Sequence, residues 1–253
     1  MSDFYPLNNL TVILVRPKFS ENIGSVARAC ANMGCPNLYL VSPQNFSLDK
    51  ACPLATPKGM KILEKASIFT QLSDALKDFH SVFGTTARIG GWRKGILLPE
   101  EASKKIKEVI SLEGNVAVVF GSEDKGLTNE EIEICGQIIS IPTVSDAWSL
   151  NLAQAVLIIL YENFKLLAER KTRPIHDKNI KLATAKDLQT LFLQLKHALL
   201  EIDFLHKDNN PDYFMMPIKR FFNRVNLRKN EYNLFMGICR QIRWLSSKNK
   251  DDS

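Results

Sequence analysis

Residues 11–34 read "TVILVRPKFSENIGSVARACANMG", and this stretch decides the fold class. Its first part, "TVILV" (11–15), is a β-branched apolar run that is typical of a buried strand. A helix is predicted from Ser20 to Met33, because Ser20 is a favoured N-cap residue and Gly34 a favoured residue just beyond a helix end. A strand that leads directly into a helix predicts an α/β protein.

The same alternation continues through the first two thirds of the chain. Further strands are predicted at 38–42, 67–71, 81–87, 115–121 and 137–142. Further helices are predicted at 58–66, 72–79, 99–110 and 149–170. Because the strands are apolar on both faces, they favour a parallel sheet that is covered by helices.

The last third differs in character. Residues 169–187 are polar and basic and contain Pro174, which predicts a linker between a domain at 1–168 and an extension at 188–253. Helices are predicted at 186–206 and at 217–247, the latter with a break near Asn226. The extension is therefore expected to be a small helical bundle.

The positive charge of the chain lies in this last third. Residues 1–170 carry 17 Lys and Arg against 18 Asp and Glu (17 − 18 = −1), and residues 171–253 carry 16 against 9 (16 − 9 = +7). This asymmetry favours either a surface that binds a polyanion or an ordinary solvated surface.

Several classes of protein are disfavoured by composition. No apolar run is long enough to span a membrane, and "MSDFYPLNNL" lacks the basic start of a signal peptide. The five cysteines form no CxxC pair or Cys/His cluster, so we expect free thiols, a cytoplasmic location and no metal. No GxGxxG, P-loop or nucleophile-elbow motif occurs.

Three predicted strand ends are rich in small and polar residues. They are "GTTARIGG" (84–91), "FGSEDKGLTNEE" (120–131) and "IPTVSDAWSLNLAQA" (141–155). In parallel sheets, ligands bind beyond the carboxyl ends of the strands, so a site is expected here. The alternative is a set of plain connections, in which Thr128 and Glu131 form a capping box for the next helix.

Gly24 and Arg28 lie one turn apart in the first predicted helix. Glycine inside a helix costs about 1 kcal/mol relative to alanine, so its presence calls for a reason. Space beneath the arginine would admit a ligand or another backbone, whereas the simpler alternative is a surface arginine above an incidental glycine.

Together these segments resemble the TrmH family of the SPOUT superfamily of RNA methyltransferases. The N-x-G-x-x-x-R, F-G-x-E-x-x-G-L and S-L-N-x-A-x-A motifs of that family match in the same order. The matching residues are Asn22, Gly24, Arg28, Phe120, Gly121, Glu123, Gly126, Leu127, Ser149, Leu150, Asn151, Ala153 and Ala155. Within that family, "KRFFNRVNLRKNEYNLFMGICRQI" (219–242) is similar to the C-terminal extension of the TrmJ branch.

The resemblance implies a fold, a cofactor and a reaction. It implies a parallel α/β sheet with a deep trefoil knot, a homodimer, and S-adenosylmethionine that is converted to S-adenosylhomocysteine. The implied reaction is 2′-O-methylation of cytidine or uridine at nucleotide 32 of tRNA. Another tRNA position, ribosomal RNA, and an inactive RNA-binding protein are the alternatives.

The resemblance also implies the site residues. The residues expected to bind the cofactor are Thr85, Thr86, Ala87, Gly121, Ile141, Trp148, Ser149 and Leu150. Trp148 departs from the family, in which a small residue or tyrosine often stands at this position.

For catalysis, the resemblance implies Arg28, Asn22, Glu123, Ser149 and Asn151. Arginine keeps its proton at ordinary pH, so we expect Arg28 to bind a phosphate and to stabilise the developing alkoxide rather than to act as a base. The asparagines would orient the ribose and Arg28, and Glu123 would hold Arg28. In the extension, a basic stripe on one helix is predicted to bind RNA through Lys219, Arg220, Arg224, Arg228 and Lys229. The alternative is that these residues pack the extension onto the first domain or onto the other copy of a dimer.

Overall fold

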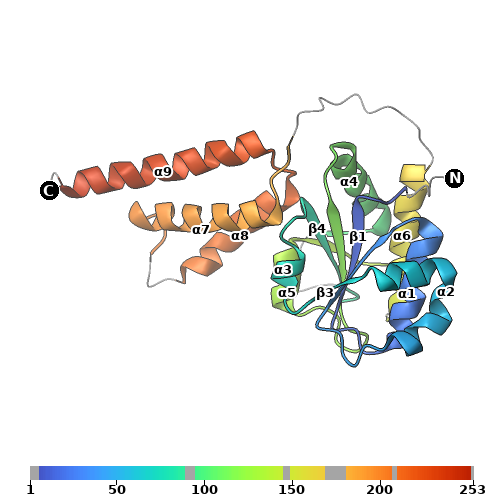
Figure 1. Ribbon diagram of the computed structural model, residues 1–253. Coiled ribbons are helices and arrows are strands. Elements are labelled where there is room, and N and C mark those ends of the chain that lie inside the picture. The colour runs from blue at the N-terminus through green and yellow to red at the C-terminus, as the bar shows by residue number, and fades with distance from the viewer. Residues whose placement is uncertain (1–5, 89–94, 145–148, 169–180, 207–209, 252–253) are drawn as a thin grey trace. The chain divides into compact units, whose positions relative to one another are not determined.

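The computed structural model describes residues 6–88, 95–144, 149–168, 181–206 and 210–251. It contains two compact units, Met1–His176 and Asp177–Ser253 (Figure 1). The first unit is an α/β domain, and the second consists of helices. Among the described residues, no helix combines the length and the apolar character that crossing a membrane requires.

The N-terminal unit is built on one seven-stranded sheet in the order β3-β2-β1-β6-β4-β7-β5, with every pairing parallel. The strands are β1 (Leu10–Val15), β2 (Asn37–Val41), β3 (Ser67–Phe69), β4 (Ser81–Thr85), β5 (Ile96–Leu97), β6 (Val116–Phe120) and β7 (Gln137–Ile139). All residues of β1 and β6 are buried. The predicted parallel sheet is thereby confirmed, although β5 has too few residues to be recognised from periodicity.

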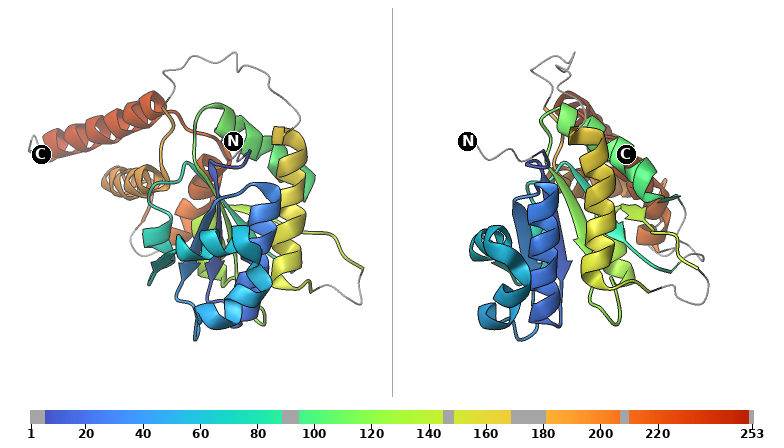
Figure 2. Two further views of the ribbon diagram at one scale, coloured as in Figure 1. Left: turned by 45° about the vertical axis from the view of Figure 1, so that its right-hand side comes forward. Right: turned by 90° about the vertical axis from the view of Figure 1, so that its right-hand side faces the viewer.

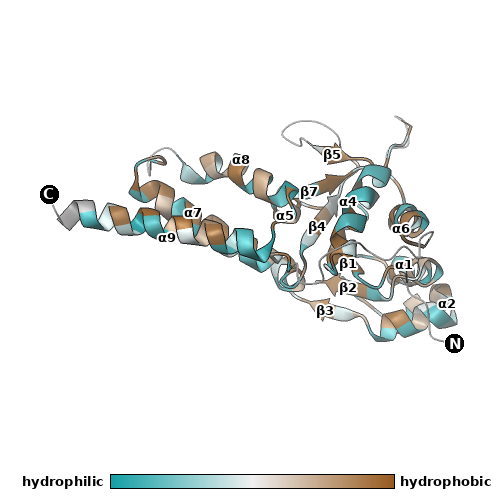
Figure 3. Ribbon diagram, turned by 90° about the horizontal axis from the view of Figure 1, so that it is seen from above, coloured by the Kyte–Doolittle hydropathy of each residue, from teal (hydrophilic) through white to brown (hydrophobic). Residues whose placement is uncertain are grey.

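Helices cover both faces of this sheet. They are α1 (Ser20–Met33), α2 (Leu48–Glu64), α3 (Leu72–Ala75), α4 (Pro99–Ser111), α5 (Asn129–Cys135) and α6 (Leu152–Ala168). Figures 1 and 3 show α1, α2, α4 and α6 on one face and α5 on the other, and the right-hand view of Figure 2 looks onto the first of these faces. Because these strands are parallel, the loops after β1, β4, β6 and β7 all lie at the carboxyl ends of the strands, on the same end of the sheet.

Helix α1 has the predicted bounds but a different N-cap residue. Gly34 ends it in the left-handed conformation, with φ 66°. The N-cap is Phe19 and not Ser20, because the Ser20 hydroxyl lies inside the first turn and accepts a hydrogen bond from the backbone N–H of Ser47 at 3.0 Å. Ser20 thus joins α1 to the start of α2.

Helix α2 begins ten residues earlier than predicted. Its first half contains Pro53 and Pro57, which lack an N–H, and Thr56 between them departs from helical geometry with φ 62° and ψ 161°. Only the part after this kink shows a regular helical pattern, so the sequence predicted that part alone.

The C-terminal unit contains α7 (Ala185–Glu201), α8 (Pro211–Arg224) and α9 (Lys229–Asp251). The capping box of Thr184 and Asp187 starts α7 inside the predicted linker. The buried side chains that hold the three helices together are Ala183, Leu188, Leu191, Ala198, Phe222, Leu227 and Cys239. The predicted break near Asn226 is present between α8 and α9.

That break corrects the predicted basic stripe. Arg220 and Arg224 lie on α8, whereas Arg228 lies beyond its end and before α9. Lys229 is occupied within the unit, because its Nζ lies 2.7 Å from Oδ1 of Asp187. The five basic residues therefore do not form one stripe on one helix.

Candidate active site

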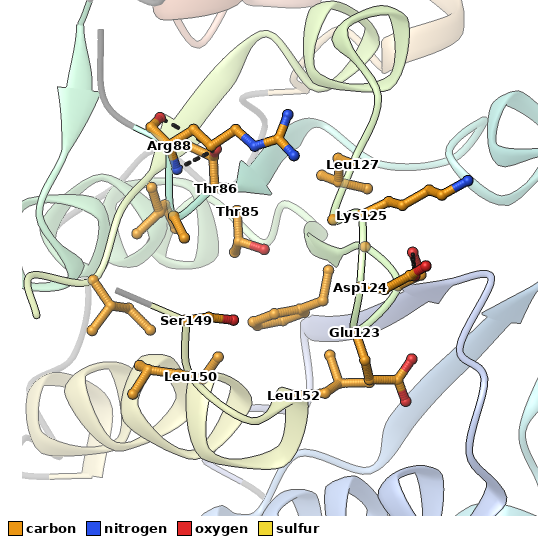
Figure 4. Close-up of a pocket in the computed structure, with 18 residues that line it drawn as sticks. Thr85, Thr86, Arg88, Glu123, Asp124, Lys125, Leu127, Ser149, Leu150 and Leu152 are labelled. Carbon is orange, nitrogen blue, oxygen red and sulfur yellow. Dashed lines mark hydrogen bonds between the residues drawn. The ribbon is translucent and has the colours of Figure 1, made fainter. Parts of the chain in front are cut away.

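A pocket opens at the carboxyl ends of β4, β6 and β7, where the three small and polar loops meet (Figure 4). Its wall includes seven of the eight residues predicted to bind the cofactor: Thr85, Thr86, Ala87, Gly121, Ile141, Ser149 and Leu150. Trp148, the eighth, lies outside the described residues. The structure therefore brings together side chains that are more than 60 positions apart in the sequence.

The pocket wall also contains residues that were not predicted to bind the cofactor, although Phe120, Leu127 and Ala155 belong to the matched motifs. Apolar contributions come from Phe120, Leu127, Ile139, Leu152 and Ala155, and polar or charged ones come from Arg88, Ser122, Asp124 and Lys125. These residues lie within or beside the three loops, so their position in the sequence was the available signal. Apolar walls with a few polar groups are usual for sites that bind organic cofactors.

The loop after β6 is closed tightly on itself. A Cβ added at Gly121 would lie 2.0 Å from the carbonyl carbon of Gly126 and 2.2 Å from the backbone nitrogen of Leu127. The N–H of Gly126 donates to the carbonyl of Ser122 at 2.8 Å, and Gly126 adopts φ +67°. Only glycine fits at position 121, which keeps the backbone of this loop beside the pocket.

The β4 side of the pocket is fixed by hydrogen bonds to neighbouring strands. The hydroxyl of Thr85 donates to the carbonyl of Val119 at 3.0 Å, and the N–H of Thr86 donates to the carbonyl of Ile139 at 3.0 Å. The hydroxyl of Thr86 accepts from the N–H of Arg88 at 3.1 Å. The two threonines thus hold the chain in a set path at the strand end.

Three predicted catalytic side chains form one hydrogen-bonded chain. Asn151 Nδ2 donates to Asn22 Oδ1 at 3.1 Å, and Asn22 Nδ2 donates to Glu123 Oε1 at 2.8 Å. Asn151 Oδ1 accepts from the N–H of Ala153 at 2.9 Å, which makes Asn151 the N-cap of α6. Helix α6 therefore begins at Leu152, three residues later than predicted, and Ser149 remains in the pocket loop.

Glu123 has a different partner from the predicted one. Its carboxylate accepts from the backbone N–H groups of Lys18 at 2.9 Å and Phe19 at 3.4 Å, in addition to Asn22. Figure 4 shows this carboxylate on the side of the loop away from Ser149. Glu123 thus joins the loop after β6 to the start of α1, and the hydrogen bonds that hold it do not come from Arg28.

Two ion pairs strengthen the same junction. The guanidinium of Arg16 binds the Glu131 carboxylate through both nitrogens, with Nη2 2.9 Å from Oε2. Lys18 Nζ lies 2.6 Å from Asp124 Oδ2. None of these four residues was predicted for the site, although Glu131 was recognised as part of a capping box, which the structure confirms.

These contacts shift the pKa values of Arg16, Asp124 and Glu131. The hydrogen bond to Glu131 raises the pKa of Arg16, and the hydrogen bond from Lys18 lowers the pKa of Asp124. Burial acts to raise the pKa of Glu131, but hydrogen bonds from Arg16 and from the backbone at Thr128 outweigh it and lower that pKa. Each of these three shifts favours the charged form of Arg16, Asp124 or Glu131.

The space above Gly24 is filled. A Cβ at this position would lie 2.0 Å from the carbonyl oxygen of Ala51, so glycine allows α1 and α2 to touch through their backbones. Of the two occupants expected at Gly24, a ligand or another backbone, the structure shows another backbone, so the glycine is not incidental. The Arg28 side chain is exposed.

The arrangement of the pocket suits binding of an organic cofactor. Backbone groups of the β4 and β6 loops offer donors and acceptors, and the apolar wall suits a flat heterocycle. Among the described residues, no group of three or more His, Cys, Asp or Glu side chains is placed to hold a metal ion.

Both units match models of known protein families. The model of the SpoU rRNA Methylase family matches residues 9–161. A second model, described as the C-terminal domain of the tRNA methyltransferase TrmJ, matches residues 186–252. The two matches lie one in each unit.

Individual relatives cover nearly the whole chain. The tRNA (cytidine/uridine/adenosine-2′-O-)-methyltransferase TrmJ of Pseudomonas aeruginosa is 33% identical over 97% of this chain and 100% of its own. The tRNA (cytidine-2′-O-)-methyltransferase TrmJ of Methanocaldococcus jannaschii is 34% identical over 88% of this chain and 94% of its own. The crystal structure of TrmJ from Z. mobilis ZM4 matches with a TM-score of 0.74 and 28% identity, over 92% of this chain and 98% of that one.

Proposed function

The chain belongs to the SpoU rRNA methylase family, and from this premise and the pocket geometry we propose that it methylates a ribose 2′-hydroxyl of tRNA, with S-adenosylmethionine as methyl donor. The match of residues 186–252 to the TrmJ C-terminal domain favours tRNA over ribosomal RNA. The finer assignment is cytidine or uridine at nucleotide 32, with the SPOUT trefoil knot, a homodimer and a cytoplasmic location. Two exposed apolar side chains one turn apart on α6, Leu157 and Tyr161, support the homodimer.

One observation carries this proposal. The pocket that contains the predicted cofactor residues is joined by hydrogen bonds to the helix that contains Arg28. The connection runs from Asn151, at the pocket side of α6, through Asn22 to Glu123. A methyl donor and a cationic group on α1 are thereby held in a fixed relation, which is what an in-line displacement requires.

The residues present fit S-adenosylmethionine. We assign the backbone at Thr85, Thr86, Ala87 and Gly121, with Ile141, Trp148, Ser149 and Leu150, to hold it. When bound, this cofactor supplies an electrophilic methyl carbon on a positively charged sulfur. The apolar side chains of the pocket wall exclude water from that carbon.

Arg28 is assigned to the RNA side of the reaction. The 2′-oxygen gains the methyl carbon and loses its proton, and S-adenosylhomocysteine is the second product. Arginine does not accept this proton, so a phosphate oxygen or a water molecule takes it. The guanidinium binds the neighbouring phosphate and stabilises negative charge as it develops on the 2′-oxygen.

The remaining polar residues position these groups. Asn22 uses both ends of its amide within the hydrogen-bonded chain, so it holds the start of α1 in place. Glu123, on the loop after β6, places its negative carboxylate against the backbone N–H groups at the start of α1. Ser149 presents its hydroxyl at the pocket, where it contacts the cofactor.

The Arg28→Ala variant tests the proposal. We expect methyl transfer to total tRNA, measured with labelled S-adenosylmethionine, to fall by at least roughly 100-fold, as it does when a transition-state donor is removed. Affinity for the cofactor, measured by calorimetry without RNA, should stay within about twofold of wild type because Arg28 is not among the pocket residues. Arg88→Ala, which changes an arginine of the pocket wall, is the matched comparison and should weaken cofactor binding instead. Appreciable transfer by Arg28→Ala contradicts the assignment.

A further inference from the structure

Helix α8 carries apolar side chains on both of its faces. Met215 and Phe222 are buried at 0% and 5% exposure, and Phe222 packs against Phe192 and Phe235 with ring centroids 6.2 and 5.0 Å apart. On the other side, three aromatic residues are more than half exposed: Tyr213 (65%), Phe214 (51%) and Phe221 (51%). A surface helix normally carries polar residues on its outer face, so this face requires an explanation.

Basic side chains share this outer face. At about 100° per residue, Arg220 and Arg224 lie within roughly 20° of Tyr213 around the helix axis, whereas Phe222 lies opposite. Phe214 and Phe221 lie about 80–100° from Tyr213, on the flank of the helix between this arc and Phe222. We call Tyr213, Phe214, Arg220, Phe221 and Arg224 the α8 aromatic face, and Figure 3 shows hydrophobic and hydrophilic segments alternating along this helix.

The unit that carries this face has a positive net charge. The C-terminal unit, residues 177–253, carries 14 Lys and Arg against 9 Asp and Glu, a net of 14 − 9 = +5. The acidic residue of α8, Asp212, is paired with Lys196 of α7, whose Nζ lies 2.8 Å from Oδ2. Lys196 thus offsets the negative charge at this end of the helix.

Exposed aromatic rings beside guanidinium groups suit one chemical class of ligand. Unpaired nucleotides offer flat bases that stack on aromatic rings and phosphates that bind arginine. A regular duplex keeps its bases inside, so the rings would gain little from it. We propose that the α8 aromatic face binds unpaired nucleotides of the RNA substrate by stacking, and this rests on the proposed function in taking RNA as the substrate.

A second copy of the chain is the competing occupant. In a two-fold symmetric pair, the same surface meets itself, so a single interface would enclose the Arg220 and Arg224 side chains of both copies. Like charges at such short range are unfavourable. The arginines thus favour RNA over self-association as the occupant of this face.

Stacking and phosphate binding differ in their dependence on salt, and this separates the two contributions. Binding is measured by fluorescence anisotropy with full-length protein and two probes, a labelled RNA hairpin with an unpaired loop and a fully paired RNA duplex of equal length. Tyr213→Ser should weaken hairpin binding roughly tenfold at every salt concentration, because stacking releases no counterions. Arg224→Ala should weaken binding of both probes and lower the salt slope by about 1.

The matched control is Leu234→Ser, which removes a side chain on α9 that is 63% exposed and should leave hairpin affinity unchanged. Thermal melting verifies that each variant is folded. Phe214→Ser and Phe221→Ser are measured in the same way as Tyr213→Ser. If Phe221→Ser disturbs the core through its neighbour Phe222, the two other variants decide the test. Unchanged hairpin affinity in both variants overturns the proposal. A smaller native mass for Tyr213→Ser in light scattering overturns it in favour of a second copy.

The measurement also separates this inference from the proposed function, since binding needs no methyl transfer. The wild-type protein could fail to transfer a methyl group to RNA while the aromatic variants still lose hairpin binding. That outcome would support the α8 aromatic face and contradict the methyltransferase assignment. Normal methyl transfer with an unchanged KM for tRNA in the aromatic variants contradicts the aromatic face alone.

Discussion

The loop after β6 and helix α9 differ in what an added methyl group would meet. At Gly121 it would overlap the backbone of Gly126 and Leu127 at 2.0–2.2 Å, whereas at Gly237 the nearest atom is the mobile end of Arg240 at 3.9 Å. The loop is closed on its own backbone, and it is tied to the start of α1 by Glu123 and to Lys18 by Asp124. Helix α9 has open space at this position. The difference indicates that the pocket loop is preorganised by backbone packing, whereas α9 tolerates an added methyl group at Gly237.

The substitution with the largest expected effect is Gly121→Ala. Overpacking against fixed backbone should lower the free energy of unfolding by about 3 kcal/mol and should abolish saturable cofactor binding, as chemical denaturation and calorimetry would show. The matched control Gly237→Ala should raise stability by up to about 1 kcal/mol, because alanine favours a helix interior. Equal effects of the two substitutions would contradict the contrast between the regions.

Glu123→Gln should have the next largest effect. The amide retains the volume but loses the charge that accepts hydrogen bonds from Asn22 and from the N–H of Lys18, which should cost about 2 kcal/mol of unfolding free energy. Because α1 would be held less firmly, kcat should fall more than the KM for the cofactor rises. Glu133→Gln, an exposed carboxylate on α5, serves as the control. A kcat equal to wild type would show that the hydrogen-bonded chain does not position α1.

The Arg16–Glu131 pair predicts a dependence of stability on pH. The pKa of Glu131 is lowered in the folded protein, so its contribution is present above its ordinary value of 4.5 and is lost as the pH falls through the folded value. Glu131→Gln should cost about 1.5 kcal/mol at pH 7, and the difference from wild type should shrink progressively below pH 4.5. Denaturant titrations of both proteins at several pH values measure it. A difference in unfolding free energy that grows as the pH falls would contradict this prediction.

The smallest effect is expected for the exposed pair of Lys18 and Asp124. Asp124→Asn should weaken cofactor binding by roughly threefold or less, because exposed ion pairs contribute little and are screened by salt. The effect should disappear at high ionic strength, where calorimetry would give equal affinities for variant and wild type. A larger loss that persists in high salt would mean that Asp124 contacts the cofactor directly.

The sequence predicted those features that depend on local pattern. The buried runs of β1 and β6 and the capped helix α1 each carry their signal within a few residues, and the motifs at three strand ends located the pocket. The features that were missed depend on contacts between distant residues. Nothing near Gly24 indicates that Ala51 will lie against it, and nothing near Glu123 indicates that its partners will be Lys18, Phe19 and Asn22. The kink at Thr56 was missed because Pro53 and Pro57 interrupt the helical period on either side of it.

Mapping the methylated nucleotide tests whether the pocket and Arg28 together methylate a ribose hydroxyl of tRNA. Wild-type protein is incubated with labelled S-adenosylmethionine and total tRNA, and the labelled nucleotide is identified by digestion and mass spectrometry. We predict a 2′-O-methylated cytidine or uridine at nucleotide 32 and no label with Arg28→Ala. Label on a base atom, or label transferred equally well by Arg28→Ala, would contradict the account.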